Sequence, residues 1–91
     1  MAEPVAEYVI TPHAAFEMER RKITEGTVRD VLAAPEQRHA VRRGRDVLQS
    51  RVLFADKRYL LRVFVDIDRS PAEVVTVYRT SRIAKYWREV L

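Results

Sequence analysis

The spacing of apolar residues divides the chain into a helical first part and an extended second part. Thr11 followed by Pro12 is a helix start, because threonine caps free backbone N–H groups and proline is tolerated at the first helical position. We therefore expect a first helix over about 12–21. Thr24 is placed to cap a second helix, which ends before Pro35. Its apolar residues recur at helical spacing: Val28, Val31 and Leu32.

From about residue 37 the pattern becomes extended and is interrupted by turn residues. It predicts four strands, at 37–43, 46–55, 58–67 and 73–80. Because the connections are short, neighbouring strands should be antiparallel. The apolar run 8–10 indicates a further small edge strand. Ser81 is a candidate cap for a last helix with an apolar stripe of Ile83, Tyr86, Trp87 and Val90.

These elements predict one α+β domain over 1–91, since 91 residues can bury a single core. In the expected architecture, two N-terminal helices pack on a four-stranded antiparallel sheet, and a C-terminal helix follows. Alternation along the strands assigns Val75 and Val77 to the face covered by helices. It assigns Val74 to the other face, with a polar set that forms our candidate site: Arg51, Arg62, Thr76 and Tyr78.

The charges narrow the possible partners. The chain has 17 basic and 13 acidic residues, and residues 38–62 alone hold eight basic and two acidic ones. A basic face on a sheet would attract a polyanion. The chain has no cysteine and two histidines, so we expect no metal site, and no cofactor motif is present. Lacking a leader or an apolar run of membrane length, it is expected to be cytoplasmic, without a membrane partner.

A row of side chains on the first predicted helix has two interpretations. His13, Glu17 and Arg21 are four residues apart, so they share one helix face. In the functional interpretation His13 is a general acid or base, Glu17 orients its ring and Arg21 holds a phosphate. In the alternative, this is a solvated face on which Glu17 pairs with Arg21.

The strands also carry candidates. Arg62 lies in the most apolar strand, where an unpaired guanidinium is costly, so it must reach solvent, a ligand or Asp66 on the same face. Its planar fork suits two phosphate oxygens. Tyr78 would stack on a base or position a proton, or simply pack half-buried. The basic turn would track a nucleic-acid backbone or protect a sheet edge; it contains Arg42, Arg43 and Arg45.

Three stretches resemble a known family. They are His13-Ala-Ala-Phe-Glu-Met-Glu-Arg-Arg-Lys-Ile-Thr24, Val31-Leu-Ala-Ala-Pro-Glu36 and Val74-Val-Thr-Val-Tyr78. Together they resemble small uncharacterised domains similar to the BrnT and RelE-type toxins. The resemblance implies a RelE-like fold, metal-independent cleavage of RNA through the ribose 2′-hydroxyl, and a small antitoxin as partner. By position it implies His13 as acid or base, Arg62 as the stabiliser of transition-state charge and Tyr78 as a stacking or proton-positioning residue.

We therefore expect a type II toxin that cleaves RNA, free or as mRNA on the ribosome, and that a cognate antitoxin neutralises. The alternative is a non-catalytic domain of the same fold that binds nucleic acid or a partner through its basic strands. A third possibility is a structural subunit whose basic face meets an acidic protein. Catalysis would depend on His13, whereas binding alone would depend on the arginines of the turn.

Overall fold

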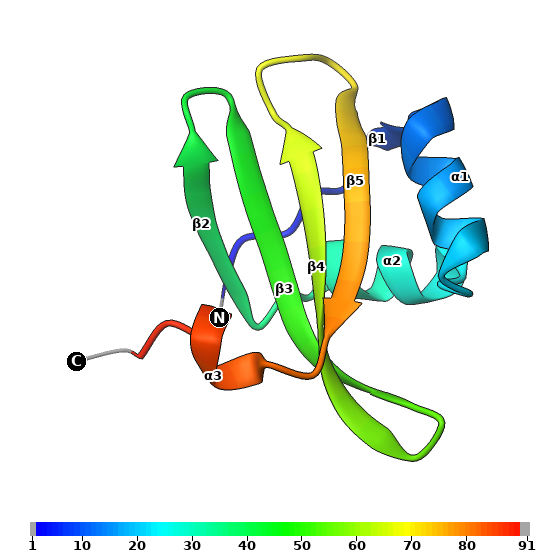
Figure 1. Ribbon diagram of the computed structural model, residues 1–91. Coiled ribbons are helices and arrows are strands. Elements are labelled where there is room, and N and C mark those ends of the chain that lie inside the picture. The colour runs from blue at the N-terminus through cyan, green and yellow to red at the C-terminus, as the bar shows by residue number, and fades with distance from the viewer. Residues whose placement is uncertain (1, 90–91) are drawn as a thin grey trace.

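The computed structural model of the protein describes residues 2–89. A five-stranded sheet lies at its centre, with the strand order β1-β5-β4-β3-β2 (Figure 1). The strands are β1 (Tyr8–Ile10), β2 (Gln37–Arg42), β3 (Arg45–Phe54), β4 (Lys57–Asp66) and β5 (Ala72–Thr80). The helices are α1 (Pro12–Arg20) and α2 (Glu25–Ala33), between β1 and β2, and α3 (Ile83–Tyr86), after β5.

The sheet is mixed, which overturns the predicted fold class. Strands β2 to β5 form an antiparallel meander, but β1 pairs in parallel with the start of β5, Tyr8 opposite Ala72 and Ile10 opposite Val74. The fold is thus not two helices on a four-stranded antiparallel sheet, and the RelE-like arrangement expected from the resemblance is wrong with it. A three-residue strand has too little periodicity to reveal a partner at the far end of the chain.

The two N-terminal helices begin where their caps predict. The Thr11 hydroxyl accepts a hydrogen bond from the Ala14 N–H at 3.2 Å, and the Thr24 hydroxyl accepts one from the Thr27 N–H at 3.2 Å. The last helix differs from its prediction. It spans four residues and starts after Arg82 without a side-chain cap, so Ser81 does not cap it. Val90, placed on its apolar stripe, lies outside the described residues.

The hydrophobic core lies between the first two helices and one face of the sheet. Figure 1 shows α2 behind the sheet and α1 beside β5. Ala14 and Met18 of α1 and Val28 and Leu32 of α2 are buried, together with a set of strand residues: Leu48, Leu61, Val63, Val65, Val74 and Val77. The face of the sheet that these helices cover is therefore filled by aliphatic side chains.

Val74 belongs to this core, although alternation assigned it to the other face. Phe64 pairs with Thr76 but the next residue, Val65, pairs with Val74, so β5 holds one extra residue, Val75. Such a bulge moves every residue beyond it to the opposite face. Val74 is consequently fully buried with Val77, and Thr76 and Tyr78 keep their predicted face.

Candidate functional site

Four side chains from four strands lie in register on the face of the sheet opposite the core. Gln37 pairs with Gln49, Gln49 with Arg62, and Arg62 with Tyr78. We call these four residues the Arg62 row. The alternation of the strands brings Arg62 and Tyr78 together as predicted from the sequence. Gln49, which was not predicted as a site residue, lies beside them and is fully buried.

Arg62 is the centre of this row. The residue is only 8% exposed, and its Nε donates a hydrogen bond to Gln49 Oε1 at 2.9 Å while Nη1 donates one to Tyr78 Oη at 2.7 Å. The guanidinium also lies 4.3 Å from the ring centroid of Tyr86 and 5.2 Å from that of Phe64. Aromatic faces attract a cation, so the rings partly replace the water that the charge has lost.

No carboxylate among residues 2–89 pairs with Arg62. The predicted alternative partner, Asp66, instead accepts a hydrogen bond from Arg45 Nε at 2.6 Å, and this bond lowers the pKa of Asp66. Nη2 of Arg62 has no hydrogen bond from the described residues, yet no side-chain nitrogen there is both unpaired and fully buried. Nη2 therefore keeps some exposure to solvent.

The next row along the same face contains the second histidine. His39 is followed across the sheet by Val47, Phe64 and Thr76. Burial lowers the pKa of His39, and the nearby charges of Arg88 and Arg62 lower it further. The imidazole is therefore neutral at pH 7 and able to accept a proton. Its position in a predicted strand, near the basic turn, was the only signal in the sequence.

His13 lies elsewhere. It is exposed on α1, which packs over the core face of the sheet, whereas Arg62 projects from the other face. Glu17 does not orient it, because its carboxylate pairs with Arg20 at 2.7 Å and with Arg21 at 3.0 Å. The alternative interpretation of this helix face thus holds for Glu17 and Arg21. Arg21 also donates from Nη1 to the backbone oxygen of Val77 at 2.9 Å.

The other predicted arginines divide into two groups. Arg51 makes a two-pronged ion pair with Glu36, Nη2 to Oε2 at 2.7 Å and Nε to Oε1 at 3.1 Å. This pairing lowers the pKa of Glu36. Arg45 is held by Asp66, as described above. Arg42 and Arg43 are exposed at the β2–β3 turn, so these two are the ones placed to meet a phosphate backbone without breaking an ion pair.

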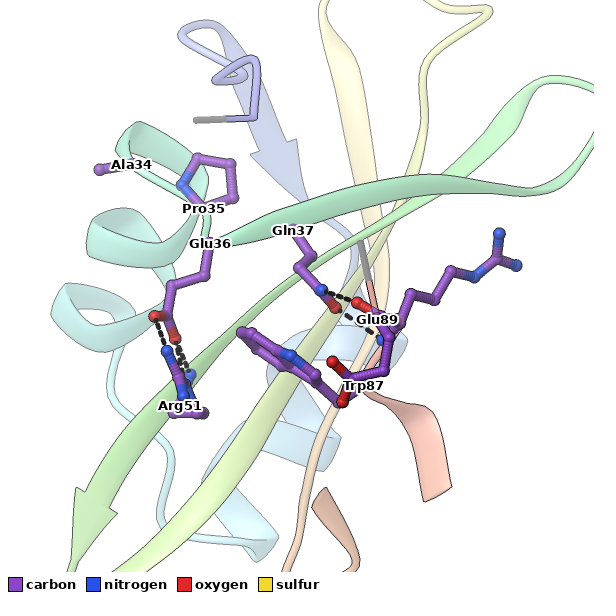
Figure 2. A pocket seen from close by; sticks show the side chains of 8 residues that line it. Ala34, Pro35, Glu36, Gln37, Arg51, Trp87 and Glu89 are labelled. Atoms are coloured by element: carbon purple, nitrogen blue, oxygen red, sulfur yellow. Dashed lines mark hydrogen bonds and ion pairs between the residues drawn. The ribbon is translucent and has the colours of Figure 1, made fainter. Parts of the chain in front are cut away.

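A pocket of about 630 Å³ opens beside the Arg62 row, where the end of α2 meets the chain after α3. It is lined by residues 34–37, Arg51 and residues 87–89. Figure 2 shows the Trp87 indole lying between the Gln37 side chain and the Glu36–Arg51 ion pair. The Arg51 guanidinium carbon is 4.3 Å from the centroid of the indole. This pocket was not predicted, because it depends on the contact of residues 87–89 with Gln37 at the edge of the sheet.

Two kinds of feature are absent from the described residues. Within residues 2–89, no group of three or more histidine, aspartate or glutamate side chains is placed to hold a metal ion. No helix in this part of the chain has the length and apolar character needed to cross a membrane.

Comparison with known proteins adds a family. The model of the family described as "Domain of unknown function (DUF4258)" matches residues 10–79. Neither the curated proteins nor the solved structures gave a match, and no BrnT or RelE-type toxin was matched. The matched segment contains Gln49, Arg62 and Tyr78, and stops before Tyr86 and Trp87. Because the match covers most of the chain, the protein belongs to the DUF4258 family.

Proposed function

We propose that this domain binds RNA on the face of the Arg62 row and cleaves it without a metal ion, as the toxin of a type II toxin–antitoxin pair. The observation that carries the proposal is the burial of Arg62 without a carboxylate partner among the described residues. A guanidinium that is 8% exposed and lacks a carboxylate partner among the described residues is costly to keep. Such a cost is typical of a group held ready for an anionic ligand. We propose a phosphodiester as that ligand, because Nη2 is unpaired among the described residues and not fully buried, and a guanidinium matches phosphate oxygens.

The neighbours of Arg62 suit the chemistry of 2′-hydroxyl attack. In that reaction the 2′-oxygen bonds to phosphorus as the bond to the 5′-oxygen breaks, leaving a 2′,3′-cyclic phosphate and a 5′-hydroxyl. Tyr78 Oη accepts from Arg62, so its own proton is free to pass to the departing 5′-oxygen. A neutral imidazole takes the proton of the 2′-hydroxyl and returns one to Tyr78 through water. Arg62 stabilises the charge that develops on the phosphate oxygens.

The imidazole in this proposal is His39 in place of the predicted His13. His39 lies on the same face as Arg62, and its pKa is lowered first by burial and then by the Arg88 and Arg62 charges. His13 lies over the core face, so it cannot act on a phosphate held by Arg62 unless the RNA crosses the edge of the sheet. The reaction class and the antitoxin partner are proposals on which the family match does not bear.

The separation of His13 from Arg62 also favours a second candidate, a non-catalytic RNA-binding domain. In this case Arg62, with Arg42 and Arg43 of the turn, supplies affinity alone. Binding would be salt-dependent, because each phosphate contact releases counterions. Neither histidine would then matter to the RNA complex.

The test is incubation of end-labelled RNA with the protein in excess chelator, beside a binding titration at two salt concentrations. We expect discrete cleavage that leaves cyclic phosphate ends. Arg62→Gln should lower the rate by about 10²–10³, as loss of one donor to a charged transition state does. Arg29→Gln, an exposed arginine on α2, is the matched control and should leave the rate unchanged.

The outcomes separate the candidates. Cleavage that falls in His39→Gln and survives in His13→Ala supports the assignment of the imidazole. Intact RNA that is bound with a steep salt dependence supports the second candidate. RNA that is neither bound nor cut, in buffer or on ribosomes, refutes both.

A further inference from the structure

We infer that the pocket beside Trp87 binds a nucleobase, so that single-stranded RNA is held by a stacked base next to the phosphate at Arg62. The inference rests on the proposed function for the source of the base. It adds a binding site whose ligand is a flat, uncharged ring. This site uses the C-terminal segment, which lies outside the part of the chain that the family model matches.

The position of the pocket is the first argument. Gln37 is both a wall of the pocket and the end of the Arg62 row. Gln49 links the two sites, because its Nε2 donates to Gln37 Oε1 at 2.8 Å and its Oε1 accepts from Arg62. Adjacent strands are about 4.8 Å apart, so Gln37 and Arg62, two strands apart, are separated by about 10 Å. Neighbouring groups of one RNA strand can span this distance.

The second argument is that hydrogen bonds anchor the backbone at Trp87 and on both sides of it. Gln49 Nε2 donates to the backbone oxygen of Tyr86 at 3.1 Å. Gln37 both accepts from the N–H of Arg88 at 3.1 Å and donates to its backbone oxygen. The Trp87 N–H donates to the Ile83 oxygen at 2.8 Å. The Arg51 guanidinium already lies over the indole, so a base would pack on the part of the ring that lines the pocket. The anchored backbone reduces the entropy lost on binding.

The third argument is the charge of the pocket. Glu36 and Arg51 neutralise each other through two hydrogen bonds, so the wall around Trp87 offers little net charge to a phosphate. Arg62, one site away, carries a positive charge that no carboxylate among the described residues neutralises. A volume of about 630 Å³ leaves ample room for one base. The pairing of an apolar ring with a nearby cationic groove is how proteins hold single strands without sequence preference.

The experiment uses Trp87 as its own probe, because it is the only tryptophan in the chain. The protein is titrated with a short single-stranded RNA made non-cleavable by 2′-O-methylation, and with the same oligomer lacking its bases. We expect the base-bearing oligomer to quench the tryptophan fluorescence and to bind about tenfold more tightly than the abasic one. The abasic oligomer should bind without quenching.

Two variants are followed by the anisotropy of a labelled oligomer. Trp87→Leu should remove the difference between the two oligomers, and Trp87→Phe should restore much of it, because phenylalanine also stacks. Arg62→Gln should weaken both oligomers equally, while Phe16→Leu, an exposed aromatic on α1, should change neither. Equal affinity of the two oligomers with no quenching overturns the base site and leaves the phosphate site standing.

If the proposed role of Arg62 fails while the base site stands, the titrations give a different result. Free nucleosides that quench Trp87, without any effect of Arg62→Gln on oligomer binding, support the base site and contradict the role of Arg62. If neither nucleosides nor oligomers quench the fluorescence of Trp87, the protein has no base site. In that case the pocket serves another occupant, such as a side chain of a protein partner.

Discussion

Replacement of Gln49 by methionine tests whether one buried amide holds the site together. Gln49 is fully buried and makes three hydrogen bonds, to Arg62 at 2.9 Å, to Gln37 at 2.8 Å and to the backbone oxygen of Tyr86 at 3.1 Å. Methionine has a similar length and no donor, so Gln49→Met removes all three bonds with little change in volume.

The magnitude follows from the kinds of bond that are lost. The bond from the charged Arg62 contributes about 1.5–3 kcal/mol and each of the neutral bonds about 1 kcal/mol. Burying the methionine side chain returns about 1 kcal/mol. The free energy of unfolding should therefore fall by about 2.5–4 kcal/mol, which corresponds to a fall in Tm of roughly 10–30 °C for a domain of this size.

Urea unfolding followed by two probes measures this effect. Far-UV circular dichroism reports on the sheet, and Trp87 fluorescence reports on the C-terminal segment. In Gln49→Met the fluorescence transition should come at lower urea than the dichroism transition, because the segment has lost its bond at Tyr86. Leu48→Met, at the neighbouring buried position, is the matched control and should cost less than about 1.5 kcal/mol. A loss under about 1 kcal/mol with coincident transitions in Gln49→Met would refute the reasoning.

Three further changes have defined outcomes. Gly44→Ala should lower the free energy of unfolding, measured by urea unfolding, by about 1 kcal/mol or more. The reason is that Gly44 has φ +82° and a Cβ there would lie 2.7 Å from Asp68 Oδ2. Unchanged stability would contradict this. The pKa of His39 is lowered from 6.5 by folding, so the unfolded chain binds more protons and stability falls as the pH drops below about 6.5. Thermal melts between about pH 7.5 and pH 5.5 should show a larger fall in Tm for the wild type than for His39→Gln; equal falls would count against it. Gln49→Glu places a carboxylate against Arg62, so RNA affinity should drop about tenfold and the salt slope should shrink by about one ion; anisotropy titrations that match the wild type would exclude Arg62 as the phosphate group.

Much of the local structure could be predicted because its signals lie within a few residues of one another. The threonine caps begin both N-terminal helices, and strict alternation brings Arg62 and Tyr78 to one face of the sheet. The pairing of β1 with β5 and the bulge at Val75 could not be predicted in this way. Both depend on the register between strands that meet only in the folded chain.

The composition of the site was harder to predict than the face that holds it. Asp66, the predicted alternative partner of Arg62, pairs with Arg45 instead, and Glu36 pairs with Arg51. Arg62 is thus left without a carboxylate among the described residues. Trp87 enters because the chain after α3 is hydrogen-bonded to Gln37. Neither the pairing of particular arginines with particular carboxylates nor the position of a short C-terminal segment produces a periodic pattern in the sequence.

The parallel pairing of β1 with β5 has a consequence for how the chain folds. Hairpins such as β3–β4 close between near neighbours, whereas Tyr8 of β1 pairs with Ala72, 64 residues further along the chain. Contacts of high sequence separation form late because their loop-closure entropy must be overcome first. During synthesis the first strand to emerge is then the last to be placed. The ribosome must release the chain beyond Val74 before the sheet can close, and α1, which packs on β5, must wait with it.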